Sequence, residues 1–315
     1  MSSLTIDDLS LIQGDILING FPKKAEIFCF FTIRAAQAFC QNIQKVNIAT
    51  GKDIKDLRKA INELADGQII DVAKTNIALT STGLTKLGNF QSTLGNGLKD
   101  LKASAPSFFG GMQAPNERQT LGDPEFREWN AKVGSQNGVG SLDGVLIVAG
   151  ITLDTVKAEL EKVKSQLNVG GEIVVELGRE VGEERHAQPG HEHFGFNDGI
   201  SHPQIIGING PNDNKLGFPL DKVTQPTGLS NSVDPGIIVI GRKGDKDPSN
   251  TSTLSGPTVQ PKPTWAKDGS FLVFRKLEQH VGKWNQFVGD NWKGAGSSQP
   301  AQFGAQLMGR WQSGK

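Results

Sequence analysis

The chain has 315 residues, of which 36% are hydrophobic and 21% charged, which is typical of a soluble protein with about two domains that each bury a core. Basic and acidic residues both number 33, so the formal net charge is zero; this argues against nucleic-acid and polybasic membrane binders, which need a basic face. The N-terminus carries no secretory signal, and no run reaches the roughly 18 apolar residues of a membrane span, so we expect a cytoplasmic protein without a membrane partner.

The first half of the chain has the pattern of an α+β domain. An N-terminal arm, residues 1–24, precedes an apolar, aromatic-rich run at 26–33 that predicts a strand. Apolar stripes and runs then predict helices at 35–46, 53–64, 82–88 and 153–167, and strands at 69–80, 145–149 and 173–177. The order is that of a ferredoxin-like domain, an antiparallel sheet with helices on one face, over residues 25–178. Residues 89–142, rich in Gly, Ser, Asn and Pro, predict a long loop.

The two cysteines, Cys29 and Cys40, lie in an apolar strand-like run and at the end of a helical one. Buried thiols are often found in such places, and a single pair is a weak signal of a disulfide or a metal site. We therefore expect two free, buried thiols.

An irregular region follows at 179–234, and its centre is a loop that reads G-H-E-H-F-G-F-N-D-G-I-S-H-P at 190–203. Glycines lie three residues before and one residue after Asp198, so the chain can bend tightly around this acid. Apolar neighbours such as Phe196 would leave the carboxyl group poorly hydrated, which suits proton transfer.

The C-terminal part, 235–315, begins with P-G-I-I-V-I-G-R at 235–242, which predicts a strand. A hydrophilic, proline-rich linker at 243–264 separates it from a second predicted strand at 270–275. A helix is expected to follow as far as about residue 287, and the sequence ends in a further helix and turn at 304–314.

The loop at 190–203 closely resembles the G-H-E-H-F-G-F-x-D-G-I-S-x-P segment of fungal dye-decolourising peroxidases. Further stretches resemble the same family: Q-G-D-I-L at 13–17, P-G-I-I-V-I-G-R at 235–242, W-A-K-D-G-S-F-L-V-F-R at 265–275 and the helix end at 304–314. The resemblance implies that residues 235–315 are an incomplete second ferredoxin-like domain. It also implies a role for Asp198, since the family's matching aspartate lies on the distal side of haem and moves protons during peroxide cleavage.

The resemblance breaks at the haem ligand. The family's proximal histidine, in a segment like H-x-R-K-x-N-P-R, and its distal arginine are not found in these 315 residues, and His280 is followed by Val-Gly-Lys. A haem peroxidase needs an axial ligand and groups that stabilise charge as the O–O bond breaks. We therefore expect a haem-free chromoprotein that binds a small organic chromophore, similar to coloured mushroom proteins of this shortened plan.

The candidate ligand-binding residues are Phe196, Asn197, Asp198, His202, Arg275 and Trp311. Alternatives remain: Asp198 could merely organise the loop, and His191 and His193 could bind a metal, although the resemblance gives them no such role. The chain could instead be a dye-decolourising haem peroxidase, as half of a two-chain enzyme or as a truncated form, or a structural remnant. The incomplete second sheet would leave an unpaired edge, so we expect a homodimer that covers it.

Overall fold

The computed structural model describes residues 4–17, 20–65, 67–125, 142–198, 204–208, 232–245 and 262–314. Its centre is an antiparallel four-stranded sheet in the order β2-β3-β1-β4. The strands are β1 (Ala25–Ile33), β2 (Ala73–Leu79), β3 (Gly144–Gly150) and β4 (Val174–Glu183). This is the ferredoxin-like order, so the fold predicted for this half of the chain is confirmed.

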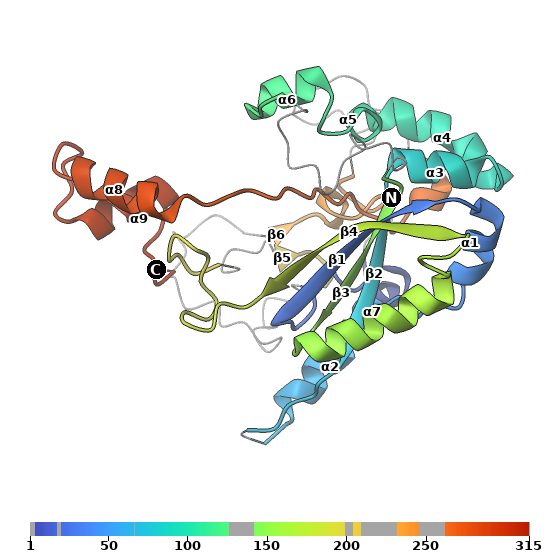
Figure 1. The fold of residues 1–315 in the computed structure, drawn as a ribbon, viewed down its shortest axis with the longest axis horizontal. Helices are drawn as coiled ribbons and strands as arrows, with labels where there is room; N and C mark the ends of the chain where they lie inside the picture. The colour runs from blue at the N-terminus through green and yellow to red at the C-terminus, as the bar shows by residue number, and fades with distance from the viewer. Residues whose placement is uncertain are drawn as a thin grey trace.

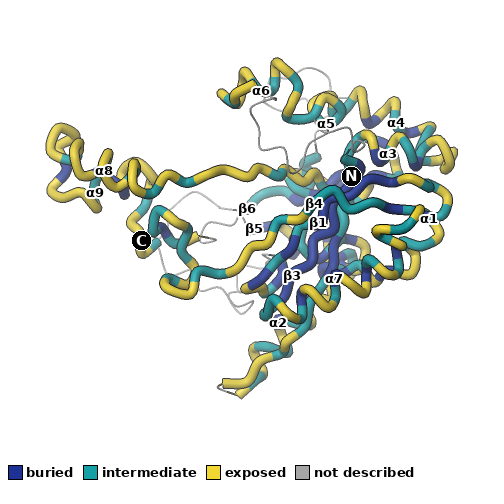
Figure 2. The backbone as a smooth tube through the Cα atoms, viewed as in Figure 1, coloured by how far each residue is buried: buried dark blue, intermediate teal, exposed yellow. Residues whose placement is uncertain are grey.

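The helices α1 (Ala36–Ile43) and α7 (Leu153–Leu167) cover one face of the sheet (Figure 1). Because side chains alternate along a strand, Ile27, Cys29 and Phe31 of β1 all point to this face, and they are almost completely buried. The apolar stripe that predicts α7 is buried along its whole length: Val156, Leu160, Val163 and Leu167. Figure 2 shows the resulting core as the buried centre of the molecule.

The other helices in this half are α2 (Gly51–Asn62), α3 (Ser81–Gly88), α4 (Ser92–Ser104), α5 (Pro106–Gly110) and α6 (Pro115–Leu121). The expectation of a loop over 89–142 is therefore wrong where α4, α5 and α6 form. Two glycines of α4 lie where the helix packs against other parts of the chain. A Cβ at Gly95 would lie 2.5 Å from the carbonyl oxygen of Gly88, and one at Gly97 would lie 2.2 Å from Nε1 of Trp265. Small residues let α4 approach its neighbours closely.

The opposite face of the sheet carries Phe28 and Phe30 of β1, with Val145 and Ile147 of β3. Phe274 packs on it, with its ring centroid 5.1 Å from the ring centroids of both Phe28 and Phe30. The chain around Phe274 is extended and runs from the sheet towards α8 (Val281–Asn291) and α9 (Pro300–Met308) (Figure 1). Aromatic packing thus anchors the C-terminal part of the chain on the ferredoxin-like domain.

The strands predicted at 236–241 and 270–275 are not formed. The first stretch is a 3-10 helix, η5 (Pro235–Ile237), followed by turns, and the second is extended without a ladder. A strand needs neighbouring backbone groups to pair with. Among the described residues, the backbone hydrogen bonds between these two parts of the chain are limited to Ile240 N–H to Gly269 O and Asp268 N–H to Ile240 O, and the Ser270 hydroxyl adds a bond to the Ile238 carbonyl. The other elements are β5 (Gln204–Ile205), β6 (Ser232–Val233), η1 (Asp7–Leu11), η6 (Thr264–Ala266), α8 (Val281–Asn291) and α9 (Pro300–Met308).

A buried arginine ties the N-terminal arm to the C-terminal part. Nη2 of Arg242 lies 2.9 Å from Oδ1 of Asp8 in η1, and its Nε lies 2.6 Å from Oδ1 of Asp268. The bond from Thr5 and the charge of Arg242 lower the pKa of the Asp8 carboxyl to about 2. A small hydrophobic cluster of Leu4, Leu9, Ile12, Leu17, Ile205, Ile208 and Val239 packs beside it.

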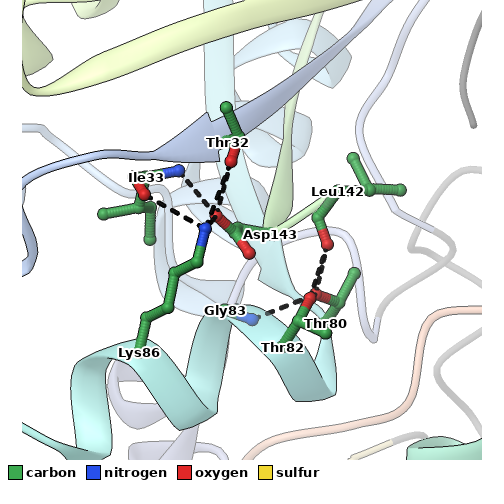
Figure 3. A network of polar contacts seen from close by, with 8 residues as sticks. All are labelled: Thr32, Ile33, Thr80, Thr82, Gly83, Lys86, Leu142 and Asp143. Carbon is green, nitrogen blue, oxygen red and sulfur yellow. Dashed lines mark hydrogen bonds and ion pairs between the residues drawn. The ribbon is translucent and has the colours of Figure 1, made fainter. Parts of the chain in front are cut away.

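A second buried charge, Asp143, holds the start of β3 against β1 and α3 (Figure 3). One oxygen, Oδ2, accepts hydrogen bonds from the Thr32 hydroxyl at 2.8 Å and the Ile33 N–H at 2.7 Å, and Nζ of Lys86 lies 2.5 Å from it. The Asp143 side chain is completely buried, whereas Lys86 stays partly exposed. This network joins three elements at one end of the sheet, and it is structural.

Candidate active site: the Asp198 loop

The loop that carries Asp198 follows β4 and folds back on itself. Gly190 and Gly195 both have positive φ, at 73° and 93°, which few other residues adopt without strain. These turns let the Asp198 N–H donate to the Gly190 carbonyl at 2.8 Å and the Glu192 N–H donate to the Phe196 carbonyl at 2.9 Å. Residues 190–198 therefore form a closed turn that ends at Asp198, and Gly199 lies outside the described residues.

Glu192 lies at the centre of the turn. Its carboxylate accepts the N–H groups of Phe194 and Phe196, both at 2.8 Å, and the side-chain amide of Gln279 at 2.5 Å. Partial burial raises the pKa of this carboxyl, but these three bonds and the nearby Arg185 outweigh burial and lower it below the ordinary value. The acid that organises the loop is thus Glu192, a role that sequence reasoning considered only for Asp198.

The loop packs on the C-terminal helices through aromatic rings. Phe196 is buried and meets Trp284 of α8 edge to face, while Phe194 lies 5.1 Å from the same indole ring. Gly304 of α9 faces the same cluster, where a Cβ would lie 3.7 Å from Phe196 and make an ordinary van der Waals contact. Helix α9 is therefore part of the surface on which the loop packs.

The final turn of the chain holds the other side of the loop. The Asn197 N–H donates to the Gln312 carbonyl at 2.9 Å, and the Gln312 side-chain amide donates to the Phe194 carbonyl at 3.0 Å. Trp311, beside Gln312, is 42% exposed. The structure therefore brings Phe196, Asn197, Asp198 and Trp311 into one region, while the ligand-binding role of these residues stays a prediction.

Asp198 itself is exposed, so the expectation that apolar neighbours leave its carboxyl group poorly hydrated is wrong. The rings expected to shield it turn instead towards Trp284. Arg275 is not brought to the loop, because it forms an ion pair with Asp123, beyond α6. His202 lies outside the described residues.

Among the described residues, no group of three or more His, Cys, Asp or Glu side chains is arranged to hold a metal ion. Nδ1 of His191 lies 2.9 Å from the Pro189 carbonyl oxygen. Cys29 and Cys40 are free, as expected; Cys29 is buried, which raises the pKa of its thiol to about 12, whereas Cys40 is half-buried. In the part of the chain that the structure describes, no helix is both long and apolar enough to span a bilayer.

Comparison with known proteins agrees with this geometry. The family model described as the DyP dimeric alpha+beta barrel domain matches residues 11–185, more than half of the sequence, where DyP denotes dye-decolourising peroxidase. The chain belongs to the dye-decolourising peroxidase family.

The relatives are fungal enzymes about twice as long. A dye-decolorizing peroxidase of Mycetinis scorodonius is 35% identical over 312 residues, which cover 97% of this chain and 51% of that protein. One from Auricularia auricula-judae is 31% identical over 316 residues, covering 99% of this chain and 51% of the relative. The solved structure of an ancestral D-type dye decolorizing peroxidase has a TM-score of 0.72 at 34% identity, covering 99% of this chain and 59% of that one. The chain thus spans about half the length of the curated relatives it matches.

These findings correct the expected cofactor. The relatives are peroxidases of a haem family, so the expectation of an unidentified organic chromophore in place of haem is wrong. Of the residues that form the haem site in the family, these 315 residues contain the position that matches the distal aspartate, Asp198, which is exposed at the end of its loop. The 315 residues contain no His-x-Arg-Lys sequence, so the family's axial-ligand motif is not among them. By themselves they do not fit a complete haem site.

Proposed function

We propose that this chain works as part of a dye-decolourising peroxidase, to which it supplies the ferredoxin-like domain and the loop that bears Asp198. The observation that carries the proposal is the exposed Asp198 carboxylate at the end of a closed turn, in a chain of this family. Such a carboxylate can accept a proton from one oxygen of peroxide and return it to the departing oxygen. The iron ligand and the distal arginine come from additional polypeptide, either a second chain or the rest of a longer one.

The surface of the C-terminal part supports the need for additional polypeptide. Phe271, Leu272, Val273 and Leu277 lie on the extended segment and are between 41% and 71% exposed. Figure 2 shows this segment as exposed over most of its length. Contiguous exposed apolar side chains mark an interaction surface, and an extended backbone is suited to pair with a partner's strand.

The test is to co-express the chain with the part of the Mycetinis scorodonius relative that it does not cover, and to add haem. We expect a stable complex with a Soret band and peroxide-dependent dye decolourisation. Asp198→Asn should retain the Soret band and lose activity by a factor of about 100 or more, the scale of a lost general acid–base group.

The matched control is Asp154→Asn, since the Asp154 side chain is 98% exposed on α7 and far from the loop in the sequence. This variant should retain full activity. A complex that takes up no haem, or an Asp198→Asn variant as active as the control, would refute the proposal.

A further inference from the structure

The contacts of Glu192 point to a role for this side chain in the Asp198 loop. The inference drawn from them rests on the proposed function. Glu192 is half-buried, and both of its carboxylate oxygens are used: Oε1 accepts the Phe196 N–H, while Oε2 accepts the Phe194 N–H and the Gln279 amide. The first two bonds close the turn within the loop. The third reaches a residue 87 positions further along the chain, so one side chain both shapes the loop and fastens it.

Gln279 completes the link from its own side. Its Oε1 accepts the His193 N–H at 3.2 Å while its Nε2 donates to Glu192, so the amide spans two points of the loop. Gln279 lies just before α8, at the end of the extended segment that packs on the sheet through Phe274. The loop is thereby connected to the segment that carries the exposed apolar side chains.

We propose that Glu192 is the positioning residue of the site: through its bonds to Phe194, Phe196 and Gln279 it fixes where Asp198 lies, and it makes that position depend on the 279–312 part of the chain. Glu192 does not touch the reacting atoms. It acts through the Asp198 N–H bond to Gly190, which can form only while the turn is closed. A loop that lacks the Glu192 carboxylate would leave two N–H groups without acceptors and would open.

The first measurement is amide hydrogen exchange, resolved to single residues, on the 315-residue chain. In Glu192→Ala, exchange of the Phe194, Phe196 and Asp198 amides should rise at least about tenfold, because the turn opens locally. Glu192→Gln keeps one acceptor oxygen and should give an intermediate increase. The amides of β1 and β3 should stay protected in every variant, which shows that the domain remains folded.

Two further variants make the result specific. Gln279→Ala leaves the turn's own bonds intact, yet it should still raise exchange at His193 and Asp198. The matched control is Glu278→Gln, since the neighbouring Glu278 side chain is 81% exposed and lies outside the turn. If Glu192→Ala does not fold, Glu192→Gln and Gln279→Ala decide the question. Exchange at Asp198 no faster than in the control would overturn the proposal.

The second measurement uses the haem-loaded complex described above. Glu192→Ala should lower kcat at least about tenfold with an unchanged Soret band and a dye KM within about twofold, and Glu192→Gln should restore part of kcat. A raised KM or a missing Soret band, with kcat unchanged, would contradict a positioning role. If the unmodified complex has no peroxidase activity, the proposed function fails, and the exchange data alone still decide whether Glu192 positions Asp198.

Discussion

At the scale of single residues, two buried charges among the described residues, Asp143 and Arg242, are each held by several partners. Asp143 is the clearest case, since its buried carboxylate bonds to Thr32 and Ile33 on β1 and to Lys86 on α3. Removing one partner of a buried ionic network leaves the others unsatisfied, and this is usually more damaging than losing a surface pair. The network therefore predicts a large effect from one substitution.

Asp143→Ala should lower the free energy of unfolding by about 3–5 kcal/mol, because it removes the acceptor of a buried hydroxyl and a buried N–H group and the charged partner of Lys86, which among the described residues keeps only the Thr32 hydroxyl and the Ile33 carbonyl. Urea denaturation followed by circular dichroism measures this change. The control Asp154→Ala, at a side chain that is 98% exposed, should change stability by less than about 0.5 kcal/mol. Equal stabilities for the two variants would show that the network does not stabilise the fold.

Asp8 makes stability depend on pH. Its pKa falls from an ordinary 3.8 to about 2 in the folded chain, so its contribution is complete above about pH 4 and is lost as pH falls towards 2. Between pH 5 and pH 3 the folded chain should lose about 1 kcal/mol more than the variant Asp8→Asn, which cannot titrate there. Urea denaturation at both pH values tests this, and identical losses for the two proteins would contradict it.

How far the site could be predicted differs between residues. The sequence predicts a bend around Asp198 from Gly195 and Gly199; the structure shows positive φ at Gly195 and a closed turn that ends at Asp198, while Gly199 lies outside the described residues. The bond between Glu192 and Gln279 could not be predicted, because it joins residues 87 positions apart and no local pattern carries it. The exposure of Asp198 was missed for a related reason, since its aromatic neighbours pack on Trp284 of a later helix.

At the scale of elements, continuous apolar runs and regular stripes were sufficient to predict β1, β3 and α7, because each buries its apolar residues within the domain. The strands expected at 236–241 and 270–275 failed because a strand depends on neighbours that composition does not reveal. Helix α4 was missed because Gly95 and Gly97 read as loop residues, although they serve close packing.

The close packing at Gly97 predicts that replacing this glycine with alanine changes stability in the opposite direction from the same replacement at an open helix position. Alanine favours a helix interior over glycine by about 1 kcal/mol, but at Gly97 its Cβ would lie 2.2 Å from Nε1 of Trp265. Gly97→Ala should therefore destabilise the chain by about 1–3 kcal/mol. Gly289→Ala in α8, where a Cβ meets no atom within 4 Å, should stabilise it by up to about 1 kcal/mol. Thermal unfolding separates these outcomes, and a stabilising Gly97→Ala would mean that the contact is not rigid.

At the scale of the whole molecule, the apolar segment that leads to α8 and α9 predicts association. The matched family model describes a dimeric domain. When no other partner is present, a second copy of the chain can bury the exposed apolar segment. Light scattering should therefore give twice the 33.8 kDa chain mass. The substitutions Val273→Lys and Leu277→Lys, at residues that are 71% and 68% exposed, should shift the chain towards the monomer, because charge opposes burial of that surface.

Lysine at Ile69, which is 68% exposed and precedes β2, is the control and should leave the dimer intact. Adding the complementary part of the Mycetinis scorodonius relative should replace the second copy, since both partners compete for the same segment, and the dimer should dissociate as the mixed complex forms. A monomeric mass for the unmodified chain at micromolar concentration would contradict the homodimer. A dimer that persists in the mixed complex would place the self-association on another surface and separate it from the completion of the peroxidase.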